Sequence, residues 1–403
     1  MATAQLPEFS DNRFLQSHIR FILDFYQHRV VAPNGGFYQA FRDDGTIFDP
    51  AVRHLVSSTR FVFNYANAAR RYQSDEYRQW AARGLDYLQS AHRQKNSSYA
   101  WVLSADKEGH VSVADDSAMA YGHAFVMLAA ASAVEAKIDA GKEIINDLWH
   151  FMEAQFWESA AGAYADERNG SLDLLDAYRG QNANMHSCEA LLAAYRATQH
   201  ERYLERAIQL AEKFAFDLAA DNQGLIWEHY KADWSADMTY NIDKPDDLFK
   251  PWGFQPGHQV EWSKLLLQIN EVNADPRWVE KAAFLFNEAI SRGWDTEHGG
   301  LVYGFAPDGS FCDSHKYFWV HAEAFAAAWR LYQVTGEQRY LDHYNRIWEW
   351  SWTYLIDHQQ GAWFRIRNRD GSAFDDLKSP PGKTDYHTLG ACWDVLDVSA
   401  ARV

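Results

Sequence analysis

A short segment of glycine and aromatic residues recurs six times along the chain, and each copy is followed by sequence of helical character. The copies lie roughly sixty residues apart, which leaves room for two helices in each interval. Such a repeat constrains the fold strongly, because each unit can bury its apolar face only against its neighbours. In chain order the segments are residues 35–38, 98–101, 162–164, 224–227, 299–303 and 361–364.

The repeat unit combines a turn-rich segment with two helices of different character. Turn signals such as Asp43-Asp44-Gly45, Asn169-Gly170, Asp308-Gly309 and Asp370-Gly371 predict short β-hairpins. The first helix of a pair is rich in alanine and apolar nearly all round, as in residues 190–197, which predicts a buried inner helix. The second has a charged face, as in Trp278-Val279-x-x-Ala282, which predicts an outer helix.

These features predict an all-α fold, an (α/α)6 barrel of six inner/outer helix pairs with short β-hairpins at one rim. We expect a single catalytic domain over residues 1–403, because no linker or low-complexity tract separates the copies. The alternative is an open solenoid of helical pairs. We favour closure because an open array needs polar capping repeats, and neither end of the chain shows one.

Charge and composition narrow the partners and the compartment. The net charge of -17 argues against nucleic acid and against anionic membrane surfaces as partners. The most apolar stretch, residues 118–134, is too short for a membrane span. Residues 1–13 lack the apolar core of a signal peptide, and three scattered cysteines form no disulfide or metal pattern, so we expect a cytoplasmic protein. We expect a monomer or a weak homo-oligomer.

Five of the six inner helices open with a histidine, namely His123, His186, His258, His321 and His387, and the first carries Ser58-Thr59-Arg60 at the matching place. In a closed barrel these first turns surround the mouth of a central cavity. The positive end of the helix dipole disfavours imidazolium there, which suits a neutral general base. We therefore predict a functional site at this mouth, although for His123 and His321 a packing role is an equal alternative.

Carboxylates accompany these histidines at helical spacing. Glu189 and Glu261 follow His186 and His258 by three residues, and Glu323 follows Trp319 by four. Imidazoles, carboxylates, a guanidinium and aromatic rings together suit a polyhydroxylated ligand. No metal-binding spacing is present, so we expect no metal. A polar insertion, residues 230–256, leads into His258 and predicts either a lid or a mere surface insertion.

At these residues the sequence resembles the N-acylglucosamine 2-epimerase superfamily over essentially the whole chain. This group of (α/α)6 barrels includes N-acylglucosamine 2-epimerases, cellobiose 2-epimerases and bacterial aldose–ketose isomerases that act on mannose or sulfoquinovose. The similarity is greatest to the mannose isomerase branch. The motifs that carry it are Ser58-Thr59-Arg60, residues 181–186, residues 256–262, Trp319-Val320-His321-Ala322-Glu323 and Asp385-Tyr386-His387.

The resemblance implies acid/base roles for His258 and His387. It also implies a reaction that opens the pyranose ring, removes the proton at C2 and passes through a cis-enediolate, with no cofactor and no metal. Return of the proton to C1 gives a ketose, and return to C2 gives the 2-epimer. Six further residues are implied to hold and polarise the sugar: Arg60, Asn182, His186, Glu261, Trp319 and Glu323.

Departures within the superfamily favour a neutral hexose. Gly382 stands where cellobiose epimerases have a tryptophan platform, and Asp246-Asp247 beside Lys250 would repel a sulfonate. The resemblance therefore implies interconversion of D-mannose and D-fructose, with a monosaccharide as the partner. The alternatives are a 2-epimerase of a mono- or disaccharide, a glycoside hydrolase that uses Glu261 and Glu323 as its carboxylate pair, and a non-catalytic binding barrel.

Overall fold

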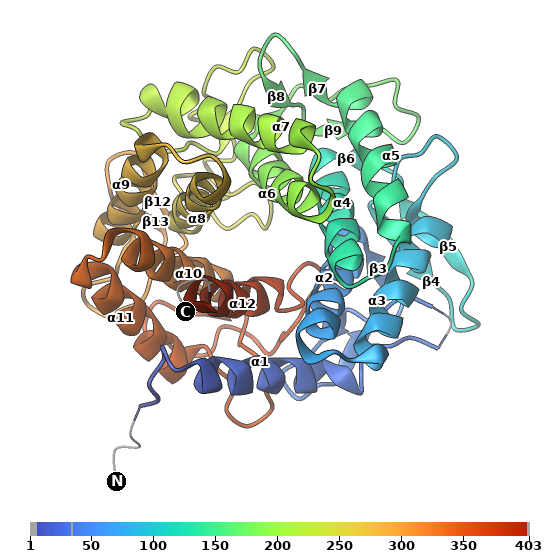
Figure 1. Ribbon diagram of the computed structural model, residues 1–403, viewed down its shortest axis with the longest axis horizontal. Coiled ribbons are helices and arrows are strands. Elements are labelled where there is room, and N and C mark those ends of the chain that lie inside the picture. Colours follow the sequence, from blue (N-terminus) through green and yellow to red (C-terminus); the bar gives the residue numbers. More distant parts are fainter. Residues whose placement is uncertain (1–5, 34, 401–403) are drawn as a thin grey trace.

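The computed structural model describes residues 6–33 and 35–400, so the first five residues of the segment assessed for a signal peptide lie outside the described residues. The described residues form twelve α-helices in two concentric layers (Figure 1). The inner helices are α2 (Leu55–Tyr72), α4 (Ala120–Glu135), α6 (Gln181–Thr198), α8 (Pro256–Val272), α10 (Phe318–Thr335) and α12 (Tyr386–Ala400). The outer helices are α1 (Asn12–Gln27), α3 (Asp75–Tyr87), α5 (Ala140–Gln155), α7 (Glu201–Ala211), α9 (Pro276–Gly293) and α11 (Gln338–Tyr354).

Helix composition explains this division into layers. The alanine-rich α4 is buried on nearly every side, whereas α7 buries one face through Tyr203, Leu204, Ala207 and Leu210 and exposes its charged residues. A helix without a polar face is stable only where protein surrounds it. The inner and outer assignments made from the sequence are confirmed.

Closure of the ring joins the two ends of the chain. Each inner helix contacts the next one, and α12 returns to contact α2. The outer helix α1 packs against α12, and the hydroxyl group of Tyr26 donates a 2.6 Å hydrogen bond to Asp385. On the same side of the ring, the indole N–H of Trp363 donates to His18 over 2.8 Å. The closed barrel is therefore confirmed, and the open solenoid is excluded.

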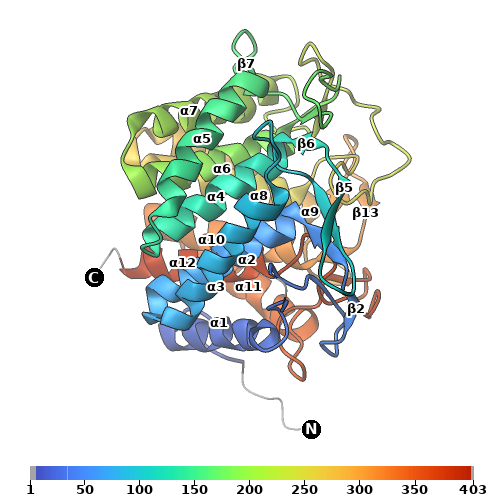
Figure 2. The same ribbon diagram turned by 90° about the vertical axis from the view of Figure 1, so that its right-hand side faces the viewer.

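Short antiparallel strands lie at one rim of the barrel (Figure 2). Four local hairpins lie at or just after the glycine/aromatic segments: β1 (Ala40–Phe41) with β2 (Ile47–Asp49), β4 (Val102–Ala105) with β5 (Val111–Asp115), β7 (Trp157–Glu158) with β8 (Ala163–Tyr164), and β12 (Gly304–Phe305) with β13 (Phe311–Asp313). The remaining pairings link neighbouring units of the repeat. They are β3 (Val52–His54) with β4, β6 (Ala118–Met119) with β9 (Glu167–Arg168), β10 (Arg179–Gly180) with β11 (His229–Tyr230), and β14 (Lys316–Tyr317) with β15 (Ile366–Arg367).

The hairpin prediction is thus confirmed in part. The turns at Asp43-Asp44-Gly45 and Asp308-Gly309 connect local hairpins. Around Asn169-Gly170 and Asp370-Gly371 the local hairpin is reduced to single bridges, 168 to 175 and 367 to 373, because β9 and β15 pair with a strand of the neighbouring unit. These strands connect adjacent units on the side where the inner helices begin.

Two further expectations concern membranes and cysteines. Among the described helices, none combines the length and the apolarity needed to cross a membrane. The apolar stretch at residues 118–134 forms β6 and the buried helix α4. All three cysteines are free, and Cys188 and Cys392 are buried.

Ring closure predicts that α1 contributes to the core as fully as any other helix. The side chain of Ile22 on α1 is completely buried. The change Ile22→Ala should therefore lower the free energy of unfolding by about 2–5 kcal/mol, measured by urea denaturation. The control is Gln16→Ala at an exposed position of the same helix, which should have little effect. Equal stability of the two variants would show that α1 is an appendage and does not close the ring.

Candidate active site

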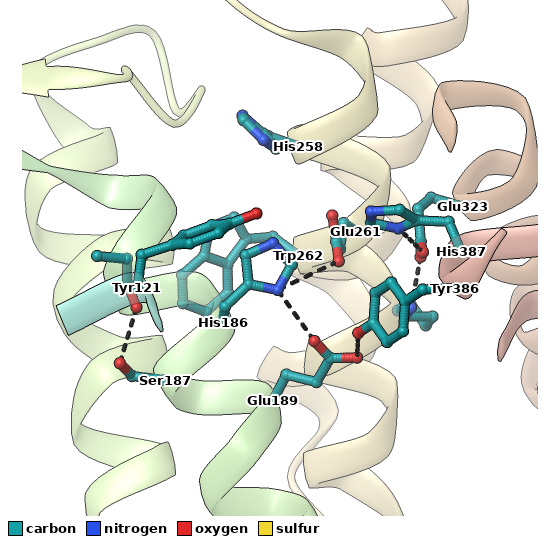
Figure 3. Close-up of polar contacts among 12 residues, drawn as sticks. Tyr121, His186, Ser187, Glu189, His258, Glu261, Trp262, Glu323, Tyr386 and His387 are labelled. Carbon is teal, nitrogen blue, oxygen red and sulfur yellow. Dashed lines mark hydrogen bonds and ion pairs between the residues drawn. The ribbon is translucent and has the colours of Figure 1, made fainter. Parts of the chain in front are cut away.

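A cavity with about 690 Å³ of space lies among the first turns of the inner helices, at the rim that carries the strands. Seven of the eight site residues predicted from the sequence line it: Arg60, Asn182, His186, His258, Glu261, Trp319 and His387. Glu323 does not line this cavity, because it lies behind His387. Figure 3 shows His186, Glu261 and His387 close together, with Glu189 and Tyr386 next to them.

His258 is held by a carboxylate that the sequence analysis missed. Its Nδ1 lies 2.9 Å from both oxygens of the buried Glu228. Because a carboxylate only accepts hydrogen bonds, Nδ1 carries the hydrogen and Nε2 is left to accept a proton. Gln181 donates to Glu228 over 2.8 Å, and the indole N–H of Trp262 donates to Gln181 over the same distance. This chain of hydrogen bonds fixes both the orientation and the tautomer of His258.

His387 is held in the same way from the opposite side of the cavity. Its Nδ1 lies 2.7 Å from Glu323, and the other oxygen of Glu323 pairs with Lys264. Its Nε2 lies 3.5 Å from a guanidinium nitrogen of Arg60. Burial, followed by the positive charge of Arg60, holds the pKa of His387 well below its ordinary value. The imidazole is therefore neutral near pH 7, as a general base must be.

The indole ring of Trp319 lies beside both imidazoles. Its centroid is 5.0 Å from that of His258 and 5.6 Å from that of His387. A Cβ atom at Gly257 would approach the indole to 2.3 Å, so only glycine fits there without displacing the ring. The apolar face that Trp319 offers to the cavity suits stacking against the carbon–hydrogen face of a sugar.

Arg60 and Tyr121 form a pair of hydrogen-bond donors in the cavity. Arg60 donates to the hydroxyl group of Tyr121 over 3.1 Å and to the carbonyl oxygen of Gly382. Its guanidinium group lies over the rings of Phe125 and Tyr386, at 4.5 and 4.8 Å from their centroids. Because the Tyr121 oxygen already accepts from Arg60, its own hydrogen is free to bind a ligand.

Two acceptor groups in the cavity lack partners among the described residues. Both carboxylate oxygens of Glu261 are buried without a hydrogen bond, and so is the amide oxygen of Asn182. Burial, followed by the charge of Glu323, holds the pKa of Glu261 well above its ordinary value, so this carboxyl group can donate as well as accept. Unpaired buried polar groups are costly. Their position at the cavity indicates that a ligand with several hydroxyl groups completes their hydrogen bonds.

His186 links Glu261 to a second carboxylate. Its Nδ1 lies 3.0 Å from Glu189 and 3.9 Å from Glu261. Burial lowers its pKa, so this imidazole is also neutral at physiological pH.

Three groups of His and acidic side chains among the described residues have ligand atoms within 4.8 Å of one another, a spacing that a metal ion could use: 106/108/110 at an exposed turn, 186/189/261 and 261/323/387.

For His123 and His321, the structure supports the packing role, one of the two alternatives that the sequence left open. Nε2 of His123 accepts a hydrogen bond from the backbone N–H of Tyr99 over 3.1 Å, and its Nδ1–H donates to a carbonyl oxygen. His321 binds the backbone N–H of Leu301 over 3.0 Å in the same way. Both rings are fully buried and do not line the cavity.

Other units of the repeat use different side chains for this contact. Asn184 accepts from the backbone N–H of Tyr164 over 2.8 Å, and Gln259 accepts from that of Ile226 over 3.0 Å. We call these four positions the anchors, because each ties an inner helix to the glycine/aromatic segment before it: 123, 184, 259 and 321. In the sequence, His123 and His321 are therefore equivalent to Asn184 and Gln259, and not to His186 or His258.

The residue two positions after each anchor faces the barrel interior. Two residues turn an α-helix by about 200°, so the side chain there points in nearly the opposite direction. By this count the inward positions of successive units are Arg60, Phe125, His186, Glu261, Glu323 and His387, with Ser58 and Asp385 at the anchor positions of the first and last units. Arg60 and the Glu residues thus share one structural position with His186 and His387.

The insertion at residues 230–256 forms part of the site. Leu248, Phe249 and Pro251 line the cavity, so it is not a mere surface insertion. The backbone carbonyl of Phe249 accepts a 3.4 Å hydrogen bond from Asn182. Lys250 does not line the cavity, because its ammonium group lies 4.3 Å from the ring centroid of Tyr178 and 3.8 Å from Glu167.

Comparison with known proteins agrees with this geometry. A family model described as N-acylglucosamine 2-epimerase (GlcNAc 2-epimerase) matches residues 36–391. The D-mannose isomerase of Marinomonas mediterranea is 45% identical over 391 residues, which cover 97% of this chain and 98% of that protein. The D-mannose isomerase of Pseudomonas cannabina pv. alisalensis is 36% identical over 280 residues, or 68% and 67% of the two chains.

A solved structure extends the similarity to the fold. A crystal structure of a D-mannose isomerase superposes with a TM-score of 0.95 at 45% identity, covering 98% of this chain and 100% of that one. The chain belongs to the N-acylglucosamine 2-epimerase family.

The anchor role of His321 can be tested by stability. The change His321→Ala leaves the buried N–H of Leu301 without an acceptor and should lower the free energy of unfolding by about 1–3 kcal/mol in urea denaturation. His321→Gln should recover part of this loss, because Gln259 makes the same contact in another unit. Wild-type stability in the alanine variant would contradict the assignment.

Buried neutral histidines predict that the protein loses stability in mild acid. Burial lowers the pKa of His123 to about 4 and that of His321 to about 3. Below about pH 6.5 the unfolded chain binds protons at these residues and the folded chain does not, so the free energy of unfolding should fall from pH 6.5 to pH 4. Urea denaturation across this range measures the slope, which His123→Gln should reduce. A slope that His123→Gln leaves unchanged would refute this explanation.

Proposed function

We propose that this protein is an aldose–ketose isomerase that interconverts D-mannose and D-fructose. The observation that carries the proposal is the pair of buried imidazoles, His258 and His387, which line one cavity on either side of Trp319. Each has its Nδ1 held by a carboxylate, so each has its Nε2 available for proton transfer. The similarity to D-mannose isomerases along the whole chain supports this choice of sugar.

The remaining cavity residues would hold the sugar. Trp319 stacks against its apolar face, and the unpaired oxygens of Glu261 and Asn182 accept from its hydroxyl groups. Arg60 and Tyr121 place donors next to Nε2 of His387, where negative charge develops on oxygen during the reaction. Glu323 acts indirectly, because it contacts His387 and does not line the cavity.

Ring opening is the first step. One of the two imidazoles removes the proton from the hydroxyl group on C1 and delivers it to O5 as the C1–O5 bond breaks. We assign this step to His258, whose Nδ1–H is paired with Glu228. The carboxylate stabilises the imidazolium that forms when Nε2 accepts the proton, as in other carboxylate–imidazole pairs. The product is the open-chain aldehyde.

Proton transfer between carbons is the second step. Nε2 of His387 takes the proton from C2, the electrons of the C–H bond form the C1=C2 double bond, and O1 becomes an oxyanion beside Arg60. The imidazolium of His387 then returns the proton to C1. His258 takes the proton of the hydroxyl group on C2 at Nε2 and passes it to O1, so O2 becomes the ketone oxygen. Atoms and charge balance, and His387 ends neutral.

Cavity shape favours a neutral monosaccharide. Gly382 lines the cavity with φ +99°, and no atom lies within 4 Å of the place where a Cβ would stand, so nothing here supports a second sugar ring. Lys250 is turned away from the cavity, which leaves a sulfonate without this cation. A glycoside hydrolase would need two carboxylates at the ligand, and Glu323 is instead engaged by Lys264 and His387.

Product analysis with matched variants tests the proposal. Purified protein incubated with D-mannose and followed by proton NMR should produce D-fructose. His258→Ala and His387→Ala should each lower kcat by about 10²–10⁴-fold. His110→Ala is the control, because this exposed histidine does not line the cavity, and the variant should keep the wild-type kcat.

Two outcomes would contradict the proposal. D-Glucose as the main product would identify a 2-epimerase, in which His258 returns the proton to C2 from the other face. Full activity in His387→Ala would refute the role of His387 as the base.

A further inference from the structure

A buried ionic layer lies beneath the sugar cavity and is made by Glu189, Lys264 and Glu323. Lys264 lies on α8, one turn after Glu261, and its ammonium group pairs with the carboxylate of Glu323. Glu189 accepts a hydrogen bond from the hydroxyl group of Tyr386. None of the three residues of this layer lines the sugar cavity.

A second cavity lies on the far side of the layer, with about 1010 Å³ of space. Lys264, Glu189, Glu323 and His387 line it. Its walls continue along the inner helices to residues near their C-terminal ends, including the half-exposed Glu271 and Asp397, so it reaches solvent. His387 thus separates the two cavities, with Nε2 near Arg60 and Nδ1 against Glu323.

We propose that Lys264 is a positioning residue for the isomerase reaction. Its ammonium group keeps Glu323 ionised, and ionised Glu323 fixes His387 as the tautomer that has its hydrogen on Nδ1 and its Nε2 free. This inference rests on the proposed function, because it assigns Lys264 a role in the reaction of His387.

The crowding of carboxylates explains why Glu323 needs a counter-ion. Burial raises the pKa of Glu323, Lys264 acts against this rise, and Glu189 and Asp394 add to it. The charged and titratable groups around the Glu323–Lys264 pair come from α2, α6, α8 and α12: Arg60, His186, Glu189, Glu261, Tyr386, His387 and Asp394. Lys264 supplies the permanent positive charge that pairs with Glu323, whose other oxygen contacts the imidazole of His387.

The protonation state of Glu323 decides which nitrogen of His387 can act. An ionised carboxylate only accepts, so Nδ1 must carry the hydrogen and Nε2 can take the proton from C2. A protonated carboxyl group would donate its hydrogen to Nδ1. The neutral imidazole would then carry its hydrogen on Nε2 and could not act as the base. Loss of the Lys264 ammonium group should therefore lower activity, because it favours the tautomer of His387 that carries its hydrogen on Nε2.

Steady-state kinetics of Lys264→Met test this role. We expect kcat at pH 7 to fall roughly ten- to hundredfold, as for other groups that orient a catalytic histidine, with KM little changed because Lys264 does not touch the sugar cavity. The pKa of Glu323 rises without the ammonium group, so activity should be lost at a higher pH than in the wild type as the pH falls. The acid limb of the kcat profile should therefore move upward in pH.

Chemical rescue gives a readout that a purely structural role would not produce. Lys264→Ala opens space at the second cavity, through which a small cation can reach Glu323. Methylammonium should restore kcat in a saturable manner. Tetramethylammonium at the same ionic strength should not, because it has no N–H group to donate to the carboxylate.

Two control variants complete the experiment. Lys316→Met removes another fully buried lysine, which pairs with Asp295, and it should lower stability while leaving the pH profile in place. The double variant Lys264→Met/Glu323→Gln removes both buried charges and keeps the test available if the single variant fails to fold. Its kcat should equal that of Glu323→Gln alone, because Lys264 acts only through Glu323.

The outcomes separate this inference from the proposed function. A wild-type protein that leaves mannose unchanged would overturn the proposed function. An active wild type, with an unmoved acid limb in Lys264→Met and no rescue of Lys264→Ala by methylammonium, would overturn the role of Lys264. Additive losses in the double variant would overturn it as well.

Discussion

The anchor hydrogen bond is the contact on which the candidate site depends. In four units a side chain in the first turn of an inner helix pairs with a buried backbone N–H of the preceding segment. The bond satisfies a polar group that burial would otherwise leave unpaired, and it fixes the rotation of the helix about its axis. Because the rotation is fixed, the residue two positions later faces the barrel interior, and in four units (Arg60, His186, Glu261 and His387) it lines the cavity.

The sequence predicted the ring and its inner and outer layers, because helical periodicity and a regular repeat are visible in one dimension, and seven of the eight site residues that it predicted line the cavity. It placed His186, His258 and His387 in the site, but for His123 and His321 it left the site and a packing role as equal alternatives. His123 and His186 both follow a turn-rich segment, and only their hydrogen-bond partners distinguish an anchor from a cavity residue. Glu228 was missed because its partner His258 lies thirty residues further on, and Lys264 because a single lysine in a helix usually faces solvent.

Two carboxylate–imidazole pairs give the cavity its chemistry. Glu228 holds His258 at Nδ1 from the same unit of the repeat, and Glu323 holds His387 at Nδ1 from the neighbouring unit. Closure of the ring is what brings α8 and α12 to the same cavity with Trp319 between their histidines. The buried charges that this arrangement requires are balanced internally by Arg60 and Lys264, so the site is preorganised before a sugar enters.

The most direct test of this account is a crystal structure with D-mannitol, an open-chain hexitol that cannot isomerise. We expect its C1–C2 end between the two imidazoles, with Nε2 of His387 and Nε2 of His258 each within hydrogen-bond reach, about 2.6–3.2 Å, of the groups on C1 and C2. The hydroxyl groups of the hexitol should form hydrogen bonds with the unpaired oxygens of Glu261. A hexitol bound outside this cavity, or with its C1–C2 end away from both histidines, would contradict the account.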